Sequence, residues 1–342
     1  MDRMENFRER VVALKQQAEH LHHHAQVLAS SQMQRFSPRL CGLLALGMVV
    51  GWLTPAAGQA ISCGATLGPG GQFLLGANLD CGTVSPALTV RDGAHLDLGG
   101  HTISGGEGFS GGPIILLDGQ GAVVHNGIVE SGLFGDGIRV AGDGGHTVHR
   151  VSVFAGRSGV SVASDHNRLH NSMAALQGGG ASFSIAGSQN LLDSNWGAGP
   201  QVGFLIGGDQ NLLRENTSAP IPPDIPPAHE GFIIGGNQNL LIRNNASAAD
   251  QNGFVIDGDG NRLMGNLALN SPFSGILVSG QETVIVGNTA LDNSTDLEDT
   301  HEDCDNNRWQ RNVFRTSQAG TTEDPTCIQG QPAQGRDVAQ NP

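Results

Sequence analysis

Short apolar runs separated by glycine, asparagine and aspartate recur at a nearly fixed interval along the middle of the chain. Runs that open with glycine and an apolar residue follow one another at steps of 22, 44, 28, 22 and 22 residues, at Gly137, Gly159, Gly203, Gly231, Gly253 and Gly275. The longest step hides one degenerate copy near Ser182, and the step of 28 holds a Pro-rich insert at residues 219–228. A repeat of about 22 residues therefore organises this part of the sequence.

Each repeat holds a second short run that asparagines frame, with the pattern Asn-x-Leu-x-x-Asn beginning at Asn190, Asn211, Asn239 and Asn261. Such runs are too short for helices, and turn residues separate them. Two or three short strands in every repeat predict a β-solenoid, in which each strand pairs in parallel with its equivalent in the next coil. We expect the asparagines to adopt left-handed turns and to stack as amide ladders. A column of phenylalanines is expected to stack inside the coil: Phe183, Phe204, Phe232 and Phe254.

The first 60 residues have the pattern of an export signal rather than of a solenoid. Residues 40–53 are apolar and follow Arg35 and Arg39, and small residues occupy the cleavage positions before Ile61. We therefore expect an N-terminal extension with a signal peptide at 1–60, a β-helix domain at 61–330 and a disordered tail at 331–342. The apolar stretch is short for a membrane span, so no stable membrane insertion is expected after cleavage. The predicted location is secreted or periplasmic.

The cysteines agree with export. Four follow residue 60, as one pair near each end of the predicted domain: Cys63 with Cys81, and Cys304 with Cys327. Three connectivities are possible for four cysteines, and this local pairing is the simplest. Two disulfides that staple the ends of a solenoid fit an oxidising compartment.

Composition narrows the classes of partner. The formal net charge is −14 and only 15% of residues are charged. A nucleic-acid binder would carry a basic patch, so we exclude that class. The chain has 51 glycines and no tyrosine. The glycines serve turns. The only lysine is Lys15, so the chain after residue 60 has neither tyrosine nor lysine, which leaves histidine and arginine as the candidate bases for proton transfer.

Three stretches resemble a known superfamily. They are the segment at 96–105 (Leu-Asp-Leu-Gly-Gly-His-Thr-Ile-Ser-Gly), the asparagine-framed coils, and the segment at 304–314 that precedes Cys327. These stretches resemble right-handed parallel β-helix proteins of the pectate-lyase-like superfamily, with its carbohydrate-binding and sugar-hydrolase repeat. The resemblance covers roughly residues 61–330 and implies an all-β fold. The superfamily includes polysaccharide lyases, glycoside hydrolases, alginate epimerases, phage tailspikes and a periplasmic accessory protein of copper-enzyme maturation.

The catalytic motifs of the pectin hydrolases, alginate epimerases and pectate lyases do not occur in the sequence, so no role carries over from them. The register of the coils offers another route to a site. When the second runs are aligned on their inward apolar residues, the next residue in each points outward, since strand side chains alternate. Five ionisable residues then stand on adjacent coils and span roughly 19 Å: His125, His149, His170, Asp193 and Arg214. Arg150 and Glu215 flank them, and Trp196 lies nearby in the sequence.

This outward column suggests two kinds of catalysis and one structural alternative. For β-elimination from a uronate, His149 or His170 would be the base and Arg214 or Arg150 the partner of the carboxylate. His125, Arg150, Glu215 and Trp196 would bind the substrate. Hydrolysis would need two carboxylates, and Asp193 with Glu215 is the obvious pair. The structural alternative is that outward residues of a solenoid are polar in any case.

Two further patterns bear on cofactors and partners. The outward columns become apolar from Leu205 and from Ile242 onward, so something should cover them. We favour the insert at 219–228 or the tail at 290–342 over an oligomer. The segment from Asp292 to Asp305 is acidic and suits Ca²⁺, but its spacing fits no EF-hand loop, and we favour a solvated acidic loop.

The sequence thus predicts an exported polysaccharide-acting β-helix protein, and it favours a lyase on an acidic glycan. The alternative is a non-enzymatic surface or periplasmic protein that binds a glycan or another partner. A third alternative, an accessory protein for metal-enzyme maturation, comes from the resemblance. Whether the chain is an enzyme, and whether a lyase or a glycoside hydrolase, stays open at this stage. Its negative charge would repel an acidic glycan unless local arginines or Ca²⁺ offset it.

Overall fold

The computed structural model describes residues 61–106, 109–132, 134–220, 226–323 and 325–332. All of them lie in one of the chain's two units, residues 59–342. The predicted signal at 1–60 and most of the predicted tail at 331–342 lie outside the described residues. Within the described ranges, we find no helix with the length and hydrophobicity that a membrane crossing requires.

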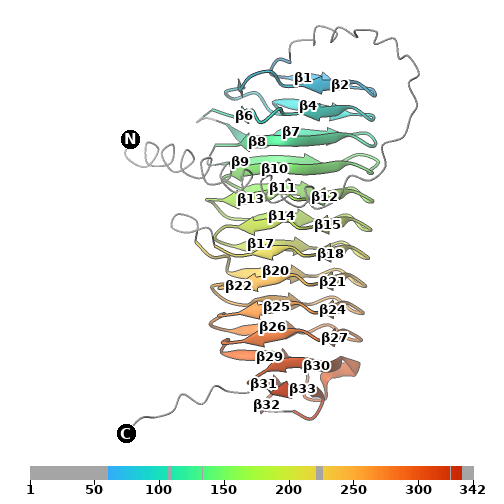
Figure 1. Cartoon of the computed structure of the whole chain (residues 1–342), viewed down its shortest axis with the longest axis vertical. Helices are drawn as coiled ribbons and strands as arrows, with labels where there is room; N and C mark the ends of the chain where they lie inside the picture. Colours follow the sequence, from blue (N-terminus) through green and yellow to red (C-terminus); the bar gives the residue numbers. More distant parts are fainter. Residues whose placement is uncertain (1–60, 107–108, 133, 221–225, 324, 333–342) are drawn as a thin grey trace, which may run out of the picture. The chain divides into compact units, whose positions relative to one another are not determined.

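The described residues form a β-solenoid of about 11 turns, which confirms the predicted parallel β-helix (Figure 1). One wall is a 13-stranded sheet, here called sheet A, whose strands follow chain order and pair in parallel except for the final pair β31–β32. Its strands are β1 (Ala65–Leu67), β4 (Leu88–Arg91), β7 (Ser110–Asp118), β9 (Phe134–Val140), β11 (Ser158–Val162), β14 (Ala181–Ile185), β17 (Val202–Ile206), β20 (Glu230–Ile234), β23 (Phe254–Ile256), β26 (Ser274–Val278), β29 (Thr295–Asp299), β31 (Ser317–Ala319) and β32 (Thr322–Glu323).

The remaining strands form the other walls, here called sheet B, again with each strand parallel to its equivalent in the next coil. The strands that continue each coil from sheet A are β2 (Gln72–Leu74), β5 (His95–Asp97), β8 (Val123–Glu130), β10 (Thr147–Ala155), β12 (Arg168–His170), β15 (Leu191–Asp193), β18 (Leu212–Arg214), β21 (Leu240–Ile242), β24 (Arg262–Met264), β27 (Val284–Val286), β30 (Arg308–Phe314) and β33 (Ile328–Pro332). Shorter strands follow them as β3 (Leu79–Asp80), β6 (Thr102–Ser104), β13 (Met173–Leu176), β16 (Trp196–Ala198), β19 (Thr217–Ser218), β22 (Asn245–Ser247), β25 (Leu267–Leu269) and β28 (Thr289–Leu291).

The predicted phenylalanine column lies in the interior and fills it over four coils. Phe183, Phe204, Phe232 and Phe254 are fully buried. Their rings stack at centroid distances of 4.9, 4.6 and 4.7 Å. These distances match the spacing between parallel strands, so each coil is held in register with the next by both its backbone and its core.

The predicted asparagine ladders are also present, and one of them is fully bonded. Asn244 illustrates the pattern: its Oδ1 accepts the backbone N–H and the Nδ2–H of Asn216, while its own Nδ2 donates to Leu213 O and to Asn266 Oδ1, all at 3.0 Å. The left-handed turn lies one residue earlier than we expected, at Glu215 (φ 55°) and Arg243 (φ 51°). The ladder asparagines are therefore selected for their buried amides rather than for their backbone conformation.

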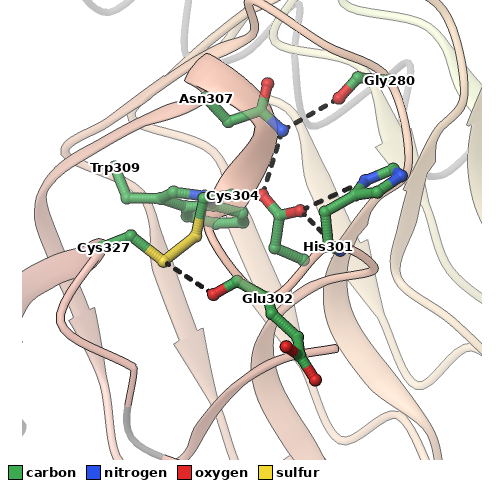
Figure 2. Close-up of a disulfide and its surroundings, with 8 residues drawn as sticks. Gly280, His301, Glu302, Cys304, Asn307, Trp309 and Cys327 are labelled. Carbon is green, nitrogen blue, oxygen red and sulfur yellow. Dashed lines mark hydrogen bonds and ion pairs between the residues drawn. A yellow bond between two sulfur atoms is a disulfide. The ribbon is translucent and has the colours of Figure 1, made fainter. Parts of the chain in front are cut away.

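Both predicted disulfides form, Cys63–Cys81 and Cys304–Cys327, one near each end of the solenoid. The second lies beside the single 3₁₀ turn of the described residues, η1 (Cys304–Asn306), and near Trp309 (Figure 2). The local pairing inferred from spacing is thus confirmed.

The acidic segment differs from the solvated loop that we expected. Asp299, at the end of β29, is buried and accepts hydrogen bonds from Asn307 Nδ2 (3.0 Å) and Trp309 Nε1 (3.1 Å). Asp296 is buried as well and accepts the backbone N–H of Arg315 at 2.7 Å. These carboxylates hold the last coils together. Nor does the described part of the tail cover the apolar columns, because β29–β33 continue the solenoid.

Candidate functional site

The three histidines of the predicted outward column stand side by side on β8, β10 and β12. The strand register places His149 opposite both His125 and His170. The imidazole rings stack with centroids 4.8 Å apart in both pairs and with interplanar angles of 11° and 1°. We call His125, His149 and His170 the histidine column. It presents a row of imidazole edges along the solenoid axis, one for each coil.

The surroundings of His149 and His170 favour the neutral form of both imidazoles. The pKa of His149 is lowered from 6.5 to about 4, first because the ring is partly desolvated and then because His125, His170, Arg150 and Arg168 oppose a further positive charge. Desolvation also lowers the pKa of His170, with Arg168 acting in the same direction and Asp193 against it. At neutral pH His149 and His170 are therefore uncharged hydrogen-bonding groups.

A carboxylate stands at each end of the histidine column. Asp97 on β5 lies 3.7 Å from His125 Nδ1 and accepts a hydrogen bond from Asn126 Nδ2 at 3.1 Å. Asp193 on β15 is in register with His170. Our sequence reasoning missed Asp97, although its outward position in the Leu-Asp-Leu run at 96–98 would have extended the column by one coil.

The other two predicted catalytic residues, Asp193 and Arg214, form an ion pair with each other. Arg214 binds Asp193 through two hydrogen bonds, Nε to Oδ1 at 3.1 Å and Nη2 to Oδ2 at 2.7 Å. This pairing, chiefly the hydrogen bond, lowers the pKa of Asp193. Glu215 accepts a hydrogen bond from Arg243 Nη2 at 2.6 Å. Each of these carboxylates thus already has a cationic partner, and Arg214 has its carboxylate.

Trp196 lies on β16, next to the strand that carries Asp193. It is 39% exposed, and its indole N–H donates to Ala219 O at 3.1 Å, where the Pro-rich insert begins. Its strand register is with Met173 and Thr217. The indole therefore lies on the outer surface, where its hydrogen bond holds it against the start of the insert.

Two exposed arginines flank the histidine column and have no partner among the residues that the structure describes. Arg150 follows His149 in a left-handed turn (φ 54°), and Arg168 precedes His170 by two residues on β12 and so points to the same side. Within the described part of the chain, neither guanidinium takes part in a hydrogen bond or an ion pair. We call the histidine column together with Arg150 and Arg168 the basic stripe.

The parallel coils and the two terminal disulfides identify the chain as a parallel β-helix protein, and the basic stripe lies on its outer surface. Residues 118–331 match the family described as periplasmic copper-binding protein (NosD), and the chain belongs to this family. The predicted secreted or periplasmic location is confirmed by this membership. No curated protein sequence matches the chain significantly.

Solved structures of similar fold include two epimerases. The A-module of mannuronan C-5 epimerase AlgE6 from Azotobacter vinelandii is 15% identical with a TM-score of 0.48, and the alignment covers 80% of this chain and 92% of the module. The periplasmic alginate epimerase AlgG is 11% identical with a TM-score of 0.44, and the alignment covers 78% of each chain.

The family description raises the question of whether the histidine column could hold copper. A metal ion binds imidazole nitrogens at about 2 Å along lone pairs that lie in the ring plane, so two ligands to one ion lie at most about 4 Å apart. The stacked rings are 4.8 Å apart and nearly parallel, so their lone pairs do not converge. Among the described residues, no group of three or more His, Cys, Asp or Glu side chains is arranged to hold a metal. The column as it stands does not fit a copper site.

Proposed function

We propose that this periplasmic β-helix protein binds an acidic polysaccharide along the basic stripe. The observation that carries the proposal is the position of Arg150 and Arg168, which have no partner among the described residues, beside three stacked imidazoles on successive coils. In a chain with a net charge of −14, two exposed arginines that neutralise no carboxylate of the described residues are available to an anionic ligand.

The repeat of the stripe suits a polymer better than a small anion. Imidazole edges recur every 4.8 Å along the solenoid axis, which is of the order of the length of one pyranose unit in a 1,4-linked chain. A neutral imidazole offers one N–H donor and one acceptor nitrogen, the same groups that sugar hydroxyls pair with. Successive sugars could thus bind successive coils, while carboxylates meet the guanidinium groups.

Trp196 is a further candidate contact for a polysaccharide that lies along the solenoid axis. Trp196 lies on β16, the strand that follows Asp193 in the same coil, two coils past the histidine at the centre of the column. An apolar ring face is a common platform for a sugar ring. A chain bound along the stripe would therefore run toward the insert.

We further propose that the basic stripe could catalyse β-elimination on the polysaccharide that it binds. A neutral His170 or His149 would take the C5 proton of a uronate whose carboxylate is bound by Arg150. The electron pair of the C5–H bond would form a C4–C5 double bond as the bond from C4 to the leaving oxygen breaks, and the leaving oxygen would take a proton from solvent. Binding is better supported than catalysis. A pKa of about 4 makes His149 a weak base, and Arg214, the other expected carboxylate partner, is already bound to Asp193.

The test uses the purified protein with a panel of uronate and neutral polysaccharides. Retention on immobilised uronate polymer, lost with Arg150→Ala and Arg168→Ala together, supports the proposal. The proposal is contradicted if the protein is retained equally on a neutral polysaccharide. It is also contradicted if no polysaccharide retains the protein. Ultraviolet absorbance by unsaturated uronate that disappears in His170→Ala would extend binding to a lyase, and reducing ends without unsaturation would point to hydrolysis.

A further inference from the structure

The outer face of sheet A carries a straight column of side chains that changes from polar to apolar and back. The strand pairings place its members opposite one another from β9 to β29, without a register shift at these positions. We call this the sheet A column, and its members in coil order are Arg139, Ser161, Ser184, Leu205, Ile233, Val255, Leu277 and Glu298.

The apolar part of this column lies on the surface. Leu205 is 36% exposed, and Ile233, Val255 and Leu277 are partly exposed. The described segments after residue 290 form further coils rather than a cover (Figure 1). Four consecutive coils that each present one apolar side chain on a flat sheet are a candidate protein interface.

Opposite charges stand at the two ends of the column. Arg139 is exposed and, in the part of the chain that the structure describes, has no hydrogen bond or ion pair from its side chain. Glu298 accepts a hydrogen bond from Ser274 Oγ and has no cationic partner among the described residues. The midpoint between these ends falls between Leu205 and Ile233.

We propose that two copies of the chain pack sheet A against sheet A with their solenoid axes antiparallel. The two-fold axis would pass between Leu205 and Ile233 and run parallel to the strands. Leu205 then faces Ile233 of the second copy, and Arg139 faces Glu298 of the second copy at both ends. This is an isologous arrangement, in which each contact occurs twice.

Charge selects this orientation over its alternative. With the axes parallel and the coils in register, each coil would meet its own copy, so Arg139 would face Arg139 and Glu298 would face Glu298. Like charges placed opposite one another across an interface suppress that orientation. The antiparallel arrangement replaces both repulsions by ion pairs at the two ends. Leu205 and Ile233 form its apolar centre, and Val255 and Leu277 face Ser184 and Ser161 of the second copy.

The size of the contact indicates a dimer of modest affinity. Seven strand spacings extend roughly 34 Å along the axis, and a strand of five residues is roughly 17 Å long. The resulting area, about 600 Å² for each copy, is somewhat below the roughly 800 Å² of a standard interface. The net charge of −14 on each copy also opposes association. The dimer is therefore expected to dissociate on dilution.

Sedimentation velocity over a wide concentration range tests the proposal, with thermal unfolding to confirm that each variant is folded. We expect the wild type to dimerise reversibly, and Arg139→Glu alone and Glu298→Arg alone each to weaken the dimer at least tenfold in Kd. An equimolar mixture of these two variants should dimerise again, because every Arg–Glu contact is restored in the mixed pair. Arg262→Glu, on β24 of sheet B, is the matched control and should leave the wild-type Kd unchanged.

The proposal is overturned if the wild type stays monomeric at all concentrations, or if the mixture is no more dimeric than the separate variants. A dimer that Arg262→Glu weakens as much as Arg139→Glu would also contradict it. The basic stripe lies on β8, β10 and β12 of sheet B, so glycan binding and dimerisation can fail independently.

Discussion

Acidification should destabilise the folded protein through His149, because its imidazole ring is stacked between those of His125 and His170. Protonation would place a charge between His125 and His170 and close to two arginines. The unfolded chain titrates at its ordinary pKa of 6.5, and the folded chain at about 4. Between these values the unfolded state binds more protons, so the free energy of unfolding decreases as the pH falls through this window.

The magnitude follows from the pKa. Lowering a pKa from 6.5 to about 4 corresponds to about 3 kcal/mol of unfavourable free energy for the charged form. Solvent screens a ring that is only partly buried, so we take about 1 to 2 kcal/mol as the effect on stability. The loss should be complete below about pH 4 and absent above about pH 7.

Denaturant unfolding at a series of pH values measures this effect in the wild type and in His149→Gln. The variant should lose about 1 to 2 kcal/mol less than the wild type between neutral pH and about pH 4. His166→Gln is the control, because His166 is exposed and glutamine occupies the equivalent left-handed turn in later coils, at Gln189 and Gln210. A histidine NMR titration that assigns His149 a pKa near 6.5, or equal pH profiles for wild type and His149→Gln, would refute the reasoning.

Three further predictions concern buried and surface polar groups. Asn244→Ala removes four buried hydrogen bonds and should lower the free energy of unfolding by about 2 to 4 kcal/mol. The control Asn237→Ala, in an exposed turn, should lower it by less than about 1 kcal/mol. Equal effects of the two substitutions would contradict the stabilising role of the asparagine ladder. His146 is buried at the top of an asparagine ladder, where its Nδ1 accepts the N–H of Ala122, and burial lowers its pKa. His146→Asn should therefore keep the fold and flatten the loss of stability as the pH falls below 6.5, and a steeper loss would oppose this role. His149→Ala should leave Cu(II) uptake, measured by calorimetry, unchanged, and a lost stoichiometric site would show that the column rearranges to chelate.

The fold and the placement of the stripe were predictable because both follow from one repeated interval. A period of about 22 residues fixes which side chains share a column, so the histidine column, the phenylalanine stack and the asparagine ladders could all be read from the register. The disulfides followed because each pair was close in sequence.

The features that the repeat did not predict depend on side-chain contacts that do not recur from coil to coil. Asp299 looked like a member of a solvated loop, but it is buried because Asn307 and Trp309, several residues later, return to bond it. The pairing of Asp193 with Arg214 also depends on side-chain directions that a column does not specify. The availability of Arg168 was missed because our reasoning followed only one of the two outward positions of each strand.

Calorimetric titration with a uronate oligosaccharide tests the central claim most directly, using the wild type, the double variant Arg150→Ala with Arg168→Ala, and Arg262→Ala. Arg262 occupies the same outward column as Arg168 four coils further on and is also exposed, so it controls for the loss of an arginine. Two exposed carboxylate contacts at about 1 kcal/mol each predict a loss of roughly ten- to hundredfold in affinity for the double variant and none for Arg262→Ala. Equal affinities for the wild type and the double variant, or no binding by the wild type, would contradict the account.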